Sequence, residues 1–253
     1  MIRVLFSHKD DWVDPVRERL DRARFSAAFQ HLHEADLSTF DCIVPLRLRD
    51  YETLRGKEDC ANFLIPSRIA VDIADDKLRF NTWLRSGGYG DLVPEFRDGA
   101  DAYPFIYKKR RDRAGRNAYV IHSPEEQHAI ETAIDADEYF KQRYVPGRKE
   151  YTSHFLMADG KIVFDTTVEF TFGDEFFIRG IREPRNTIKK VVTPFLSVFA
   201  DILETLDYKG TCCFNYKIEN GKPLVFEINP RAGGSLRLDL NNYLDAYLGA
   251  LAA

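Results

Sequence analysis

The sequence predicts an α/β amino-terminal part with a small parallel sheet, followed by a longer α+β part built on antiparallel strands. Short apolar runs at residues 2–6, 41–46 and 62–65, with helical or loop segments between them, are typical of buried parallel strands. In the second half, alternating strands flank residues 159–160 and 219–222, and both patterns indicate antiparallel hairpins. The two parts therefore belong to different sheet classes.

Composition narrows the class of protein. The chain has 253 residues, of which 44% are hydrophobic and 30% charged, and its formal net charge is −4. Such a mildly acidic chain gives no support for a nucleic-acid or membrane-surface role. No apolar run approaches the roughly 20 residues of a membrane span, and no signal-peptide pattern opens the sequence. The four cysteines show no zinc spacing, and the adjacent Cys212 and Cys213 are poorly placed to pair, so we expect a cytoplasmic protein. The charge and the lack of a membrane span predict neither nucleic acid nor membrane as a partner.

The amino-terminal part carries no dinucleotide signature. Its first apolar run is followed by SHKDD at residues 7–11, where a Rossmann fold would have a glycine-rich turn. A Rossmann dinucleotide site is therefore not expected.

Two lysines stand at the ends of predicted elements in the next segment. A helix opens at 75–78 and stops at the glycines 87–88, so Lys77 lies on its first turn. Lys108 lies near the end of the apolar strand 103–109, and burial of its stem would hold the charge in place for a phosphate group. Taken alone, a lysine on a first helical turn is equally compatible with a solvated surface.

A basic loop follows this strand. Residues 110–117 contain four arginines and a single glycine, Gly115, and a further strand is predicted at 118–121. The loop would bind phosphate through charge more than through backbone amides. A solvated surface, or a surface for an acidic partner, is the alternative, and the sequence leaves both open.

The remaining segments supply core helices and two further arginines. Helices are expected at 123–134, at 193–206 and from about residue 236, because capping signals or apolar residues at helical spacing occur there. Arg179 and Arg182 lie near a glycine and are candidates for holding a carboxylate or phosphate, with solvated arginines as the alternative.

Residues 225–235, VFEINPRAGGS, form the strongest candidate site. In an extended strand, Glu227 and Asn229 share one face, and Arg231 continues on the same side. A carboxylate, an amide oxygen and a guanidinium in a row suit a hard divalent cation beside an anionic group. An edge strand with a solvated face is the alternative interpretation.

The register of a hairpin decides whether Asn215 joins this site. A two-residue loop at 220–221 would pair Asn215 with Phe226 on the wrong face, whereas a three-residue loop pairs it with Val225. Asn215 and Glu227 share a face only in the second register, so a metal site requires the three-residue loop.

Taken with G-T-C-C-F-N-Y-K-I at 210–218, this stretch resembles the end of an ATP-grasp domain. That superfamily includes biotin carboxylase, carbamoyl phosphate synthase and D-alanine–D-alanine ligase. The resemblance covers about residues 75–253 and includes Lys77, Lys108 and the segment 142–150 in the family's order.

The resemblance implies both a fold and a set of binding residues. A pre-ATP-grasp α/β domain at 1–74 would precede an α+β ATP-grasp domain at 75–253, in which two subdomains grip ATP between antiparallel sheets. The hinge near 142–150 would meet the nucleotide, and the hairpin 210–231 would bind the metal. The residues implied to bind ATP are Lys77, Lys108, Gly115, Gln142, Arg143, Val145 and Glu150. The ligands implied for Mg²⁺, with Mn²⁺ as an alternative, are Asn215, Glu227 and Asn229, where Asn215 replaces the family's usual acidic residue.

The reaction implied is that of an ADP-forming carboxylate–amine ligase. ATP would phosphorylate a small-molecule acid, and a small-molecule amine would then displace phosphate. Lys108 and Arg231 are the implied catalytic residues, while Arg179, Arg182, Gly234 and Ser235 are the candidates for holding the substrate. A small-molecule kinase of the same family, or a non-catalytic nucleotide-binding regulatory protein, is the alternative, and a homodimer is compatible with all three.

Overall fold

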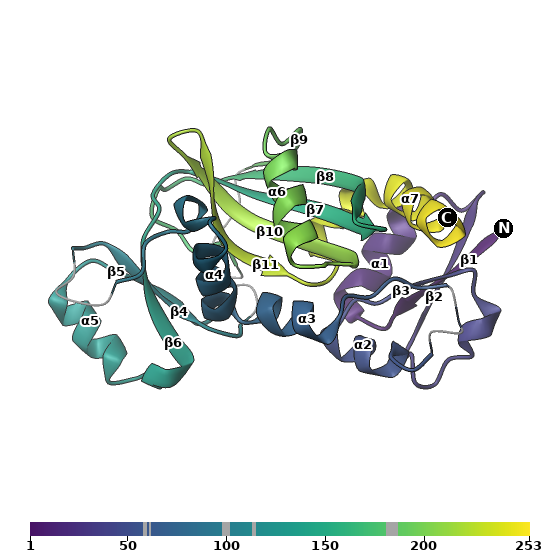
Figure 1. Cartoon of the computed structure of the whole chain (residues 1–253), viewed down its shortest axis with the longest axis horizontal. Helices are drawn as coiled ribbons and strands as arrows, with labels where there is room; N and C mark the ends of the chain where they lie inside the picture. Colours follow the sequence, from purple (N-terminus) through teal and green to yellow (C-terminus); the bar gives the residue numbers. More distant parts are fainter. Residues whose placement is uncertain (58–59, 61, 98–101, 113–114, 181–186) are drawn as a thin grey trace.

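The computed structural model describes residues 1–57, 60, 62–97, 102–112, 115–180 and 187–253. The described strands form three sheets arranged along the long axis of the molecule (Figure 1). A parallel sheet lies at one end together with both chain termini, a five-stranded sheet occupies the middle, and a small antiparallel sheet lies at the other end. Over the residues that the structure describes, no helix is both long and apolar enough to cross a membrane.

The predicted small parallel sheet is confirmed, but one of its strands is not the one expected. It consists of β1 (Ile2–Ser7), β2 (Phe25–Gln30) and β3 (Cys42–Val44), in the order β2-β1-β3. The strand predicted at 62–65 is wrong, because the Leu64 N–H donates to Tyr247 Oη at 2.7 Å instead of joining a ladder. Strand β2 lacks a predictive signal because its FSAAFQ sequence mixes polar and small residues with only two large apolar ones.

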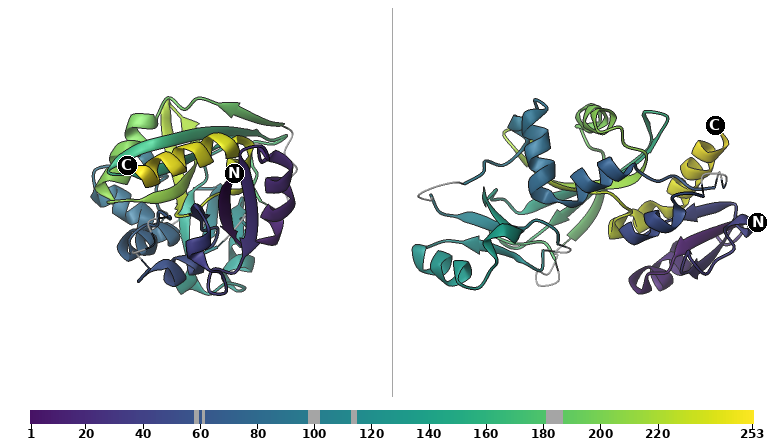
Figure 2. Two further views of the ribbon diagram at one scale, coloured as in Figure 1. Left: turned by 90° about the vertical axis from the view of Figure 1, so that its right-hand side faces the viewer. Right: turned by 60° about the horizontal axis from the view of Figure 1, so that its bottom comes forward.

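The two ends of the chain are packed together. The carboxy-terminal helix α7 (Leu240–Ala252) follows a 3₁₀ turn at Gly234–Asp239 and lies beside the amino-terminal strands (Figure 2). Its Tyr243 and Tyr247 share an apolar core with Val4 and Phe6 of β1. The remaining elements of this end are α1 (Asp10–Arg19), α2 (Leu48–Leu54) and a 3₁₀ turn at Leu37–Thr39.

Helix α4 (Lys77–Ser86) occupies the place predicted for it. Asp76 is the N-cap, and its carboxylate accepts from the Arg79 N–H at 3.1 Å. Lys77 is therefore the first helical residue, which directs its side chain to the amino-terminal end of the helix. Helix α3 (Arg68–Asp75) precedes it and a 3₁₀ turn at Gly90–Leu92 follows.

The small antiparallel sheet carries the predicted lysine strand at its centre. It consists of β5 (Ala118–Ile121), β4 (Phe105–Lys109) and β6 (Tyr139–Arg143), in that spatial order. Helix α5 (Pro124–Glu131) and a 3₁₀ turn at Ala136–Glu138 connect β5 to β6, so the helix ends earlier than predicted.

The five-stranded antiparallel sheet carries most of the candidate residues. Its order is β11 (Lys222–Asn229), β10 (Gly210–Glu219), β7 (Lys149–Ala158), β8 (Lys161–Thr171) and β9 (Thr187–Val191). Helix α6 (Leu196–Thr205) packs Phe199 and Ile202 into one core with Phe155 and Phe214 of the sheet. Alternation then leaves the opposite set of β7 and β10 side chains for the other face.

The predicted three-residue loop of the β10–β11 hairpin is wrong, but Asn215 and Glu227 do lie on the same face of the sheet. Glu219 pairs with Lys222 across a two-residue loop whose residues Asn220 and Gly221 have φ values of 50° and 75°. The register then shifts between Asn215 and Tyr216, so that Asn215 pairs with Glu227. A bulge is therefore what brings Asn215 and Glu227 to the same face, because an extra residue reverses the alternation.

Candidate active site

A cavity of about 1080 Å³ lies where the small sheet faces the five-stranded sheet, and it extends to α1. One wall carries Lys77 and Lys108, and the other carries side chains of β7, β10 and β11. The predicted residues that line the cavity are Lys77, Lys108, Gly115, Gln142, Arg143, Val145, Glu150, Arg179, Asn215, Glu227, Asn229, Arg231, Gly234 and Ser235. Arg182 lies outside the described residues.

Glu227 lies at the centre of the polar contacts. Its Oε1 accepts from the side-chain amides of Asn215 (2.6 Å) and Asn229 (3.0 Å), and its Oε2 lies 3.1 Å from Lys77 Nζ. Burial by itself would raise the pKa of Glu227, but Lys77 and the Asn229 amide outweigh it and lower the pKa to about 2. Glu227 is therefore a carboxylate at neutral pH.

Lys108 is a buried lysine held by neighbouring strands. Its Nζ donates to Gln142 Oε1 at 3.0 Å and to the Phe226 carbonyl at 3.2 Å. Gln142 is held in turn, since its amide donates to Asn81 Oδ1 and to the Pro94 carbonyl, both at 3.0 Å. Burial, together with the nearby Lys77, lowers the pKa of Lys108 to about 8.

A second buried lysine, Lys217, lies beside the predicted hinge. Its Nζ donates to the Val145 carbonyl at 2.8 Å, and burial lowers its pKa to about 8. Arg143 pairs with Glu219 at 2.7 Å, which ties the hinge to β10. Lys217 is not among the predicted site residues, although alternation along β10 places it on the same face as Asn215. That alternation was the available signal.

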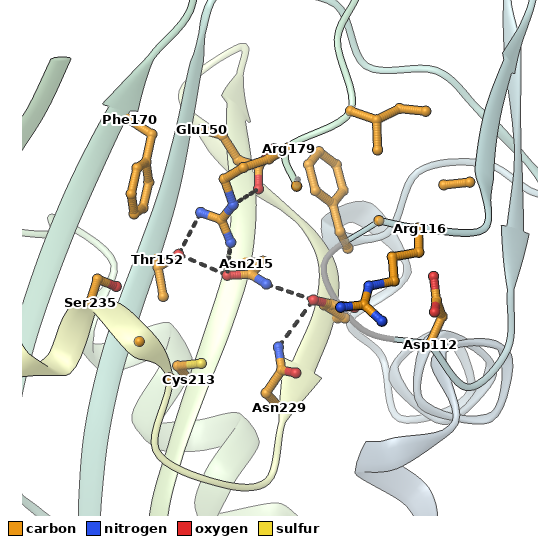
Figure 3. Close-up of a pocket in the computed structure, with 18 of the residues that line it drawn as sticks. Asp112, Arg116, Glu150, Thr152, Phe170, Arg179, Cys213, Asn215, Asn229 and Ser235 are labelled. Carbon is orange, nitrogen blue, oxygen red and sulfur yellow. Dashed lines mark hydrogen bonds and ion pairs between the residues drawn. The ribbon is translucent and has the colours of Figure 1, made fainter. Parts of the chain in front are cut away.

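Arg179 binds side chains of two neighbouring strands (Figure 3). Its guanidinium donates to Thr152 Oγ1 of β7 and to Asn215 Oδ1 of β10, both at 2.6 Å. Its Nε lies 3.1 Å from Glu150 Oε1. Burial raises the pKa of Glu150, while Arg179 opposes that shift. The structure thus links Glu150, Arg179 and Asn215 into one polar chain.

Arg231, Gly234 and Ser235 line another part of the cavity. Arg231 Nη2 donates to Asn229 Oδ1 at 3.0 Å, and Ser235 Oγ lies 2.7 Å from His154 Nε2. Burial lowers the pKa of His154 to about 3, so its ring is neutral at pH 7. His154 and Thr152 are not among the predicted site residues, although they share the Glu150 face of β7 by simple alternation.

Gly115 lies where the basic loop meets the Arg179 segment. Its φ is 60°, and an added Cβ would lie 2.6 Å from Ile178 Cγ2 and 2.9 Å from the Arg179 carbonyl oxygen. Only glycine fits this approach without displacing backbone. Gly115 therefore lies against Ile178 and the backbone of Arg179.

The oxygen atoms of the site suit one hard divalent cation. Mg²⁺ is commonly bound by one or two carboxylates together with substrate phosphates, and Glu227 supplies such a carboxylate. Asn229 Oδ1 now accepts from Arg231, and a turn of its amide would present this oxygen beside Glu227. Asn215 differs, because its oxygen faces Arg179 and its nitrogen faces Glu227. Its role as a ligand stays a prediction.

No family model and no curated protein matches the sequence, whereas solved structures match nearly all of the chain. Phosphoribosylamine–glycine ligase from Thermotoga maritima has a TM-score of 0.72 and 14% identity, over 98% of this chain and 76% of that chain. D-alanine–D-alanine ligase from Bacillus anthracis, complexed with ATP, has a TM-score of 0.68 and 13% identity, over 100% and 98%. The biotin carboxylase domain of the Hydrogenobacter thermophilus 2-oxoglutarate carboxylase, in complex with MgADP, ADP and bicarbonate, has a TM-score of 0.64 and 13% identity, over 99% and 69%. At these identities the likeness establishes the fold.

Proposed function

The chain has the ATP-grasp fold, and from that premise we propose that it is an ATP-dependent ligase that joins a carboxylate to an amine. The observation that carries the proposal is the meeting of Lys77 and Lys108 with Glu227 in one cavity between two antiparallel sheets. Cations opposite a carboxylate that can hold Mg²⁺ provide the charge pattern that a triphosphate requires.

In this proposal each part of the cavity has one task. Lys77 and Lys108 neutralise the phosphates, and Gln142 keeps the Lys108 ammonium in place. The segment 142–150 and Gly115 contact the nucleotide, with Glu150 at the ribose. Glu227 and Asn229 would hold Mg²⁺, which when bound offsets charge on the phosphoryl group being transferred.

The acid and the amine would bind where the cavity approaches α1. Arg231 offers a two-pronged donor for an acyl phosphate, and Gly234 and Ser235 lie beside it along the cavity. We propose residues 1–74 as the pre-ATP-grasp domain and 75–253 as the ATP-grasp domain with two subdomains. A homodimer and a cytoplasmic location complete the proposal.

Two other functions compete with the ligase. A kinase of the same fold would stop at phosphoryl transfer to a hydroxyl group. A regulatory protein would bind ATP without turnover, and the replacement of an acidic residue by Asn215 is the observation that favours it.

A trapping experiment separates the three. An acyl phosphate is a mixed anhydride, so hydroxylamine should convert it to a stable hydroxamate. Given ATP, Mg²⁺ and a pool of candidate acids without amine, the ligase should form hydroxamate together with ADP and phosphate. A stable phosphoester without free phosphate would indicate the kinase. ATP binding without any product across the acid and hydroxyl pools would indicate the regulatory protein.

ATP affinity should fall as the pH rises through 8. The amines of Lys108 and Lys217 are charged below their pKa values of about 8, and a polyanion binds the charged forms better. The terminal phosphate of ATP has a second pKa of about 6, so its charge is constant over this range. Between pH 7.5 and 9.0, one such lysine weakens binding by about eightfold if the bound state requires the proton.

Calorimetric titration with a non-hydrolysable ATP analogue measures this effect. Lys108→Arg is the matched control, because a guanidinium stays charged throughout, and its affinity should fall less steeply with pH than that of the wild type. Equal slopes for wild type and Lys108→Arg would show that Lys108 does not contact the phosphates.

A further inference from the structure

Asn215 has a single amide orientation that its surroundings allow. Arg179 Nη2 and Thr152 Oγ1 lie 2.6 Å and 2.8 Å from its Oδ1. Because a guanidinium only donates hydrogen bonds, the atom facing it must be the oxygen. On the other side, the carboxylate of Glu227 only accepts, so the amide nitrogen must face it, at 2.6 Å.

The guanidinium of Arg179 is enclosed by hydrogen-bond acceptors and an aromatic ring. Three acceptors on two strands surround its guanidinium, which also lies 4.6 Å from the ring centroid of Phe170 on β8 (Figure 3). Its side chain is 19% exposed, while those of Glu150 and Glu227 are 10% and 20% exposed. A positive charge is therefore fixed beside the buried carboxylate of Glu150, and Asn215 lies between this charge and Glu227, whose own counter-charge is Lys77.

We propose that Arg179 takes the place of a divalent cation at the Asn215 end of the site, so that the chain binds its nucleotide with one metal ion instead of two. This inference rests on the proposed function. Two-metal sites bracket a transferred phosphoryl group from both sides, and Mg²⁺ is usually bound through one or two carboxylates together with substrate phosphates. Among the contacts that the structure describes, Glu227 is the only carboxylate that accepts hydrogen bonds from both Asn215 and Asn229. Glu150 pairs with Arg179 instead. Within the described part of the chain, no group of three or more His, Cys, Asp and Glu side chains could hold a metal.

A guanidinium and a metal ion differ in a way that fixes the residue at 215. A second metal ion would be held best by a carboxylate at 215, whereas a side chain between Arg179 and Glu227 needs an oxygen acceptor at one end and a hydrogen-bond donor at the other. Asparagine provides both ends, and aspartate would place a second negative charge against Glu227. Asn215 and Arg179 therefore form a functional pair, although 36 residues separate them.

Counting bound Mn²⁺ by electron paramagnetic resonance tests the proposal. With the protein saturated by a non-hydrolysable ATP analogue, the wild type should bind one Mn²⁺ per chain. Asn215→Asp should still bind one, because the new carboxylate pairs with Arg179. The double variant Asn215→Asp/Arg179→Met should bind two, since it combines an anionic ligand with removal of the guanidinium.

Asn215→Asp/Arg116→Met is the matched control, because Arg116 also lines the cavity but has no hydrogen bond to Asn215 among those of the described residues. Its count should remain one. Two Mn²⁺ on the wild type, or one on a folded Asn215→Asp/Arg179→Met variant, overturns the proposal while leaving ATP binding intact. If the double variant does not fold, the wild-type count decides alone. If the analogue does not bind at all, the proposed function itself fails.

Discussion

Glu227→Gln should lower kcat by about 100- to 1000-fold while leaving the fold intact. The substitution keeps the shape of the side chain and removes one negative charge. Lys77 then loses the carboxylate that lies 3.1 Å from its Nζ, and a divalent cation loses the one anionic ligand that Glu227 provides. The amide of the glutamine would also point its N–H group either at the Lys77 ammonium or at an asparagine N–H, so that two hydrogen-bond donors face each other.

Steady-state kinetics with the acid that forms hydroxamate measures the effect. Glu169→Gln is the matched control, because Glu169 lies on the same sheet but pairs with Lys149 and Tyr151 outside the cavity. Its kcat should stay within about twofold of the wild type. A Glu227→Gln variant that keeps more than a tenth of the wild-type kcat would contradict the proposed metal and phosphate site.

The sequence predicts those residues of the candidate site whose position follows from the pattern of their own strand. Lys108 lies near the end of an apolar strand and Glu227 in an alternating one, and neither pattern depends on another part of the chain. Arg179 and Asn215 are both predicted site residues, but Arg179 is predicted to hold a carboxylate or phosphate and Asn215 a metal ion. Their contact depends on the register of β7, β8 and β10 together, and no local pattern encodes it.

Two features of the fold also depend on contacts that local sequence patterns do not encode. The predicted hairpin loop is one residue too long, because loop length sets the register only where no bulge intervenes, and a bulge lies beside Asn215. Residues 62–65 have the apolar composition of a strand, yet Leu64 forms its backbone hydrogen bond with Tyr247 near the other end of the sequence. Composition predicts burial there and does not tell a strand from a buried extended segment.

Arg231→Lys should lower kcat by about a hundredfold and change the affinity for ATP by less than about threefold. A lysine keeps the charge but cannot make two parallel hydrogen bonds to an acyl phosphate. Arg231 contacts Asn229 through one nitrogen at 3.0 Å, so part of its guanidinium is available to the cavity that it lines. Because the loss would arise with the acyl group, the analogue should bind the variant as it binds the wild type.

Two measurements on one variant therefore locate the role of Arg231: calorimetry with the analogue and the rate of hydroxamate formation. Arg24→Lys serves as the control, because Arg24 pairs with Asp245 at the surface and neither residue lines the cavity. If Arg231→Lys weakens analogue binding as much as it slows the reaction, Arg231 acts on ATP and not on the acid. If it keeps the full rate, the acyl phosphate has no two-pronged contact with Arg231, and a phosphoester product from the same assay would then favour the kinase over the ligase.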